Sequence, residues 1–232
     1  MFARTVRGPQ TLPPRLLEIY EKWNDAYERR PGWSELGEGR LWEELCFCIL
    51  SSNVPYEMAS TAVIQLTQKG LLDFEDSRRI RASSIASELS RPVYHPRRKD
   101  GSLRVYRFPR NGAHNVVGAW TYLYLNNAGL RSLLRMKLVP AELRLILASN
   151  VPGIGFKEAS HFLRDVKYTD ALAVLDTHIV SFLDSFVEPL QAGSLTPRRY
   201  VQLEALMIEL AKNLGLSPAV FDMAVWEYMR AS

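Results

Sequence analysis

Residues 140–166 constrain the fold more than any other stretch, because two helical sequences meet there through a short turn. The turn NVPGIG lies between PAELRLILAS and FKEASHFLRD. Gly153 and Gly155 permit backbone conformations and close approaches that a Cβ atom would block. Ile154 between them can fill the gap between the helices, and N–H groups at the start of the second helix suit one phosphate. We therefore expect a packed helix pair, with Gly153 and Gly155 as phosphate contacts.

Helical periodicity continues along most of the chain. Apolar residues recur at three- and four-residue spacing in 12–29, and 40–52 is apolar nearly all round, which predicts a buried central helix. The tight-turn signal at 99–102 predicts a small β-hairpin near 93–106. The expected fold class is all-α. The predicted helices span 12–29, 40–52, 55–69, 82–90, 113–127, 140–149, 157–166, a helix from 177, 197–213 and 217–230.

Composition excludes several classes of protein. Apolar residues make up 47% of the 232 residues and charged residues 23%, as in ordinary globular proteins. No apolar run reaches the ~18 residues of a membrane span, and the N-terminus does not resemble a secretory signal, so we expect no membrane association and a cytoplasmic location. Cys46 and Cys48 are expected to be buried thiols. Two cysteines are too few to ligate a four-cysteine iron–sulfur cluster. Without HxxxH or HxxE spacing, we predict no metal and no cofactor.

Positive charge is concentrated in residues 91–110. The only acid there is Asp100, and three aromatic residues, Tyr94, Tyr106 and Phe108, lie among the cations. Phosphate contact combined with base stacking requires such a mixture. A solvated basic loop explains the segment equally well. The basic residues are Arg91, Arg97, Arg98, Lys99, Arg104, Arg107 and Arg110.

The helix–PGIG–helix unit resembles the helix-hairpin-helix motif of DNA-binding proteins. GFKEASHFLRDV, followed by LAVLDTHI, is most similar to the archaeal-type, class 2, 8-oxoguanine DNA glycosylases of the helix-hairpin-helix (HhH-GPD) superfamily. LWEELCFCILSSN and YRFPRNGA resemble the same enzymes, and the similarity is weakest in the N-terminal arm and in a 91–104 insertion. The resemblance implies two lobes: a helical barrel over 39–170, and a second lobe from 1–38 with 171–232.

The resemblance implies catalytic roles for Lys157 and Asp176. In that superfamily a lysine at the start of the second motif helix is the nucleophile, and an aspartate at the head of the next helix assists it; Asp176 follows Lys157 by 19 residues. A helix N-terminus and desolvation by DNA both disfavour a charged ammonium group, which favours the nucleophilic amine. Lys157 could instead contact phosphate or be solvated, and Asp176 could simply be a helix N-cap.

Other site residues follow from the resemblance, each with a structural alternative. His178 is expected to contact a DNA phosphate or to end a helix. Asn53 is expected to fill the space of the extruded base, and Phe108 to stack on or wedge against the partner base or to be buried. Trp226 could stack on the extruded base or lie in the core. Ser232 ends the chain where the family has a lysine whose terminal carboxylate lies in the pocket, so the residues do not secure recognition of the base.

The resemblance implies a bifunctional base-excision repair enzyme, a DNA N-glycosylase and AP lyase that removes 8-oxoguanine. Its partner is double-stranded DNA containing an oxidised base, and a monomer located at the nucleoid in a prokaryote is expected. The alternatives are a glycosylase of the same fold for another lesion, a non-catalytic DNA-binding module and a protein-binding scaffold. The sequence leaves open the opposite-base preference and the relative rates of the glycosylase and lyase steps.

Overall fold

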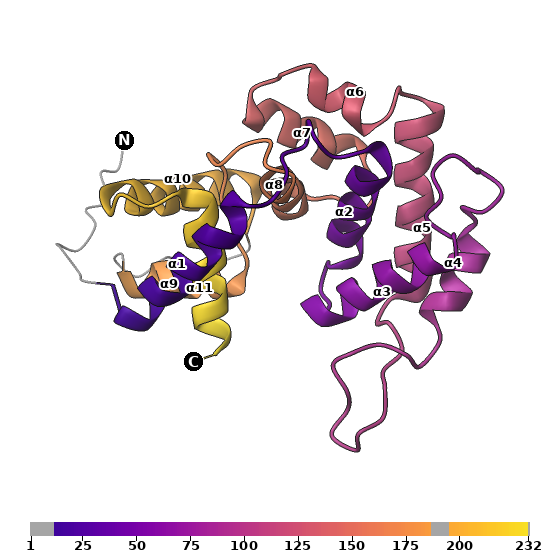
Figure 1. Cartoon of the computed structure of the whole chain (residues 1–232), viewed down its shortest axis with the longest axis horizontal. Helices are drawn as coiled ribbons and strands as arrows, with labels where there is room; N and C mark the ends of the chain where they lie inside the picture. The colour runs from indigo at the N-terminus through magenta and orange to yellow at the C-terminus, as the bar shows by residue number, and fades with distance from the viewer. Residues whose placement is uncertain (1–11, 187–194, 232) are drawn as a thin grey trace. The chain divides into compact units, whose positions relative to one another are not determined.

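The computed structural model describes residues 12–186 and 195–231, and within them every regular element is a helix (Figure 1). The prediction of an all-α fold is confirmed. Backbone contacts divide the chain into two units, one of them continuous, Gly32–Val166, and the other formed by Met1–Pro31 with Lys167–Ser232. We call them the central unit and the terminal unit.

The central unit is built around α2 (Glu38–Leu50), whose residues from Leu45 to Leu50 are all buried. Helices α3, α5, α6 and α8 pack against it. This confirms the buried central helix that the apolar run predicts, because a helix that is apolar all round must be covered on every side. The other helices of this unit are α3 (Tyr56–Gln68), α4 (Ala82–Leu89), α5 (Pro109–Trp120), the π-helical turn η1 (Thr121–Leu125), α6 (Leu130–Arg135), α7 (Pro140–Asn150) and α8 (Phe156–Asp165).

The terminal unit packs α1 (Pro14–Glu28) along α11 (Pro218–Arg230). Helices α9 (Thr177–Phe186) and α10 (Pro197–Asn213) complete the unit by packing on α11. The Lys167 ammonium group donates to the carbonyls of Tyr27 and Glu28 at 3.1 and 3.4 Å, next to the end of α1. A cation in that position stabilises the helix C-terminus.

Two helices of the central unit differ from the prediction. Helix α5 begins at Pro109 rather than at residue 113, because a proline at the first helical position lacks only an N–H that has no helical partner there. Helix α6 was not predicted from the sequence. Its first N–H groups bond to a residue far away in the sequence: the Glu38 carboxylate accepts from the N–H groups of Leu130 and Arg131 at 2.6 and 3.0 Å.

The segment between α4 and α5 contains a single antiparallel bridge, Tyr94 with Arg104, in place of the predicted two-stranded hairpin. Its backbone loops away from the helices of the central unit (Figure 1). No helix within the described residues is both long and apolar enough to span a membrane. Among those same residues, no group of three His, Cys, Asp or Glu side chains could hold a metal ion.

Candidate active site

Helices α7 and α8 are joined by a turn with a buried apolar interior. Val151 and Ile154 are 3% and 4% exposed, and the Ile154 N–H donates to the Val151 carbonyl at 3.1 Å. Gly153 has φ +81°, and a Cβ on it would lie 2.8 Å from the Asn115 side chain of α5. Only glycine satisfies both constraints, so the turn adopts the close approach that the PGIG sequence predicts.

The N–H of Gly155 is already used within the chain. Gly155 is the N-cap of α8, and its N–H donates to Glu158 Oε2 at 3.2 Å, while its carbonyl accepts from the Ala159 N–H at 2.9 Å. Glu158 therefore supplies the carboxylate half of a capping box. A phosphate contact by the Gly155 amide would therefore have to compete with the Glu158 carboxylate.

Lys157 lies in the first turn of α8, as predicted. Its side chain is 32% exposed, and Nζ lies 3.8 Å from Glu158 Oε1. One turn later His161 Nε2 lies 3.2 Å from Asp165 Oδ2, and the His161 ring makes an edge contact with Phe47 of α2. The helix face that carries Lys157 is thus fixed by packing on α2, while the ammonium group reaches solvent.

The segment before Asp176 is held by three polar side chains of the terminal unit. Asp222 Oδ2 accepts from the Val174 N–H at 2.6 Å. Glu204 Oε1 accepts from the Ala173 N–H at 3.2 Å, and the Tyr200 hydroxyl accepts from the Leu175 N–H at 3.0 Å. Asp222, Glu204 and Tyr200 are all buried. Irregular backbone is costly to bury unless its polar groups are paired, and these bonds fix the approach to Asp176.

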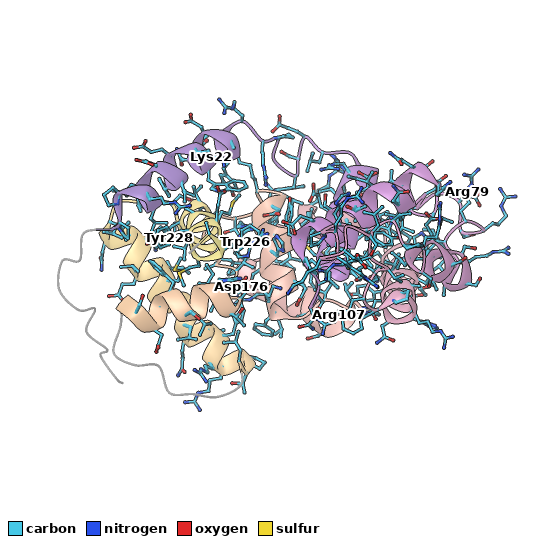
Figure 2. All side chains as sticks on the ribbon, turned by 90° about the horizontal axis from the view of Figure 1, so that it is seen from below. Lys22, Arg79, Arg107, Asp176, Trp226 and Tyr228 are labelled. Atoms are coloured by element: carbon cyan, nitrogen blue, oxygen red, sulfur yellow. The ribbon has the colours of Figure 1, made fainter. Side chains whose placement is uncertain are left out.

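Asp176 is the N-cap of α9. Its Oδ1 accepts from the N–H groups of His178 and Ile179 at 2.9 and 3.0 Å (Figure 2). The carboxylate is therefore oriented by the backbone, and Oδ2 takes part in neither bond. The structural alternative for Asp176 thus holds, and it is compatible with a chemical role. The His178 backbone lies in the first turn of α9, and its side chain is half-buried.

Three exposed residues of the central unit lie together beside the end of α2. Arg107 Nη1 donates to the carbonyl of Asn53 at 3.1 Å, and its guanidinium lies 5.1 Å from the centre of the Phe108 ring. Asn53 has φ +57° and Phe108 is 38% exposed, so the buried alternative for Phe108 is wrong. Arg107 was not among the predicted site residues, although it precedes Phe108 in YRFPRNGA.

The predicted base-reading residues are less well defined. Trp226 of α11 is half-buried, and the Arg230 guanidinium lies 4.4 Å from the centre of its ring. The neighbouring Glu227 accepts from Trp23 Nε1 at 2.6 Å and pairs with Lys22 at 3.1 Å, which ties α11 to α1. Ser232 lies outside the described residues.

The central unit thus carries Lys157, the PGIG turn and the group Asn53, Arg107 and Phe108. Asp176, His178 and Trp226 belong to the terminal unit. Each group is positioned within its own unit by the contacts described above. The two units provide a lysine at a helix N-terminus and an N-capping carboxylate, which are the residue types of lysine-dependent covalent catalysis.

Comparisons with known proteins give consistent results. Residues 24–216 match the family model described as 8-oxoguanine DNA glycosylase. An 8-oxoguanine DNA glycosylase/AP lyase of Picrophilus torridus is 31% identical over 80% of this chain and 77% of its own length. A protein of the same name from Aquifex aeolicus is 27% identical over 92% of this chain and 91% of its own.

Solved structures support the same fold. An 8-oxoguanine glycosylase/lyase of Methanocaldococcus jannaschii, in complex with 15mer DNA containing 8-oxoguanine, has a TM-score of 0.72 at 21% identity and covers 94% of this chain and 96% of its own. A 3-methyladenine DNA glycosylase of H. pylori has a TM-score of 0.60 at 14% identity, covering 93% and 97%. The resemblance found in the sequence is confirmed: this chain belongs to the 8-oxoguanine DNA glycosylase family of helix-hairpin-helix proteins.

Proposed function

We propose that this chain excises 8-oxoguanine from duplex DNA and then nicks the strand, with Lys157 as the nucleophile. The observation that carries the proposal is the position of Lys157 in the first turn of α8, directly after the PGIG turn, in a member of this family. Both sequence relatives reported above are named 8-oxoguanine DNA glycosylase/AP lyase. The chain is accordingly a DNA N-glycosylase and AP lyase, and we propose that it acts in the cytoplasm, at the nucleoid in a prokaryote.

The proposed chemistry begins with extrusion of the damaged nucleotide from the stack. The neutral amine of Lys157 attacks C1′, and the N-glycosidic bond breaks with its electron pair leaving on the base, which takes up a proton. The sugar ring then opens as O4′ gains a proton, and a Schiff base forms between C1′ and Nζ. Loss of a C2′ proton expels the 3′ phosphate by β-elimination, and water releases the lysine.

Asp176 is proposed to assist at two points. Positive charge develops at C1′ as the base departs, and a fixed carboxylate stabilises it. The same carboxylate can accept the proton that the Lys157 ammonium must lose before it attacks. The N-cap bonds on Oδ1 support this role because they orient the carboxylate before DNA binds, which leaves Oδ2 to face the substrate.

The remaining roles concern the DNA around the lesion. Asn53 is proposed to occupy the space left by the extruded base, with Phe108 and Arg107 contacting the partner base. Their mutual contacts support this, because one bound strand could touch all three. His178 and the glycines of the turn are proposed to contact phosphates. Trp226 is proposed to stack on the extruded base, which requires Arg230 either to cover only the far face of the ring or to move.

Borohydride trapping tests the mechanism, because borohydride reduces the Schiff base to a stable covalent adduct. The unaltered chain and Lys157→Gln are compared on duplexes that carry 8-oxoguanine opposite cytosine or an abasic site. We expect an adduct on both duplexes with the unaltered chain and on neither with the variant. An adduct on the abasic duplex alone would assign the chain to another lesion. DNA binding without any adduct would favour a non-catalytic module.

A further inference from the structure

We call the segment 91–107 the basic hairpin. Of its residues, only Arg107 has a role in the proposed function. We infer that the basic hairpin is a preformed arm that contacts the phosphate backbone of the duplex away from the lesion. The inference rests on the proposed function only in taking duplex DNA as the partner. It concerns a surface that neither the PGIG turn nor Lys157 belongs to.

The basic hairpin is ordered by its own hydrogen bonds. Tyr94 and Arg104 exchange N–H···O bonds of 2.9 and 3.0 Å across the segment. Nearer the tip, the Arg98 N–H donates to the Ser102 carbonyl at 2.8 Å, and Arg97 Nη1 donates to the Gly101 carbonyl at 2.7 Å. A segment ordered in advance loses little conformational entropy when it binds, which favours a contact arm over a solvated loop.

Two tyrosines anchor the basic hairpin to the helices of the central unit. Tyr94 is fully buried, and its hydroxyl donates to the Glu88 carbonyl at 2.9 Å. Tyr106 is 3% exposed, and its hydroxyl donates to the Leu50 carbonyl of α2 at 2.7 Å. The two rings meet edge to face at 6.2 Å. The aromatic residues are therefore structural, and the sequence expectation that Tyr94 and Tyr106 stack on bases is wrong.

With the aromatic side chains buried, the exposed surface of the basic hairpin is cationic. The only acid of the segment, Asp100, is exposed, and its carboxylate accepts from the Ser102 N–H and hydroxyl at 2.9 and 2.6 Å; the hydroxyl bond in particular lowers its pKa. Arg91 pairs with Glu88 at 2.8 Å. Arg98 and Lys99 are exposed at the tip. Such a surface fits phosphates, whose contact with cations releases condensed counterions, and its two tyrosine rings are too buried to stack on bases.

The position of the hairpin in the chain also favours DNA. Its last residue is Arg107, which contacts Asn53 and Phe108, the group proposed to lie at the lesion. The eight steps from Lys99 to Arg107 span ~26 Å when the chain is extended. This length corresponds to about seven nucleotides of one strand. A duplex held at Asn53 and Phe108 therefore has phosphates within reach of the tip.

The first test compares two variants of equal charge change. Arg98→Gln/Lys99→Gln neutralises the tip, and Arg78→Gln/Arg79→Gln neutralises two cations of the same unit whose side chains are 83% and 57% exposed. Affinity for undamaged duplexes is measured against salt concentration. On a duplex of about 25 bp, each lost phosphate contact should reduce the slope of log K against log[NaCl] by ~0.9. We expect a reduction of about one to two for the tip variant and none for the control.

Duplex length separates a distant contact from a general effect of charge. A duplex of about 11 bp centred on the lesion position extends only ~17 Å to each side, less than the ~26 Å that the segment from Lys99 to Arg107 can span. On it the tip variant and the unaltered chain should bind equally. An unchanged slope on the long duplex, or equal losses in the control variant, would overturn the inference. Failure of the proposed function would show separately, as absence of the borohydride adduct with the unaltered chain.

A second test locates the tip on the DNA. Lys99→Cys introduces an exposed thiol into a chain whose described cysteines, Cys46 and Cys48, are 0% and 1% exposed. A DNA-cleaving iron chelate attached to residue 99 should cut a lesion-bearing duplex within about seven nucleotides of the lesion. The matched control carries the chelate through Arg79→Cys (Figure 2). Cleavage that is absent, or no more localised than in the control, would show that the tip does not lie on the duplex.

Discussion

At the scale of single residues, Asp176 combines a structural and a chemical role that substitutions can separate. Asparagine is as good an N-cap as aspartate, whereas alanine costs about 1 kcal/mol of stability. Asp176→Asn should therefore keep the free energy of unfolding while single-turnover base excision slows by roughly 10²–10⁴-fold, the usual size of a lost acid–base group. Asp176→Ala should lower both the free energy of unfolding and the excision rate. Urea unfolding measures the first quantity, and a rapid-quench assay of base excision measures the second. Excision at the unaltered rate in Asp176→Asn would exclude the chemical role.

Gly153 is the residue on which the PGIG turn depends. Alanine there would face both φ +81° and a Cβ contact of 2.8 Å with the Asn115 side chain. A left-handed backbone costs ~1–2 kcal/mol for a non-glycine residue, and overpacking adds ~1–3 kcal/mol. Gly153→Ala should thus destabilise the chain by about 2–5 kcal/mol in urea unfolding.

Gly101 offers the matched control for Gly153. It has φ +82°, but nothing lies within 4 Å of the position of its Cβ. Gly101→Ala should therefore show the backbone cost alone, about 1–2 kcal/mol. Equal losses at the two positions would mean that Asn115 yields to the new methyl group without cost.

At the scale of secondary-structure elements, α6 shows what local sequence cannot predict. The six residues LRSLLR are too few to be a stable helix by themselves. The helix forms because Glu38, 92 residues before Leu130, accepts its first N–H groups. That pairing depends on the packing of α6 against α2, so no pattern within the six residues indicates it. Helices with long apolar periodicity, such as α2 and α10, need no such partner and were predicted to within two residues.

The same contact gives a prediction. Glu38→Gln removes the charge that the helix dipole and the two N–H groups of α6 favour. We expect the free energy of unfolding to fall by about 1–2 kcal/mol, as for hydrogen bonds to charged groups. Hydrogen exchange in α6 should quicken more than in α8. Glu209→Gln, at an exposed position of α10, serves as the control and should change stability by less than ~0.5 kcal/mol. Equal effects of the two substitutions would remove the capping role.

At the scale of the whole molecule, the sequence predicted helix positions better than the polar contacts around them. Lys157 and Asp176 lie at helix starts as the sequence predicted, and their catalytic roles, which the family resemblance implies, stay predictions. Arg107 was predicted only as one cation of the basic segment, because its partners, the Asn53 carbonyl and the Phe108 ring, are brought to it only by folding. The use of the Gly155 N–H by Glu158 is a local capping box, and the FKE sequence could have revealed it. Most helix positions could be predicted from the sequence, whereas the long-range polar contacts could not.

The buried thiols at the centre of α2 give the molecule a specific response to alkaline pH. Burial raises the pKa of Cys46, and of Cys48 as well, with a smaller contribution to each from nearby carboxylates. In the unfolded chain a thiol ionises near pH ~8.5. The folded state then holds protons that the unfolded state has lost, so the stability is fully present below this pH and declines as pH rises. Each thiol contributes up to ~1.4 kcal/mol per pH unit while it stays protonated in the folded state.

Urea unfolding between pH ~7.5 and ~9.5 measures this decline, which should reach about 2.7 kcal/mol for the two thiols together. Cys46→Ala/Cys48→Ala removes both groups, so its stability should be lower at neutral pH because of lost packing but nearly flat over the same interval. The slope rather than the absolute stability is therefore the readout. Burial also raises the pKa values of Tyr94, Tyr106 and Tyr124, whose contributions begin only above pH ~10. Parallel curves for the two proteins would mean that the decline comes from other groups and that α2 opens before its thiols ionise.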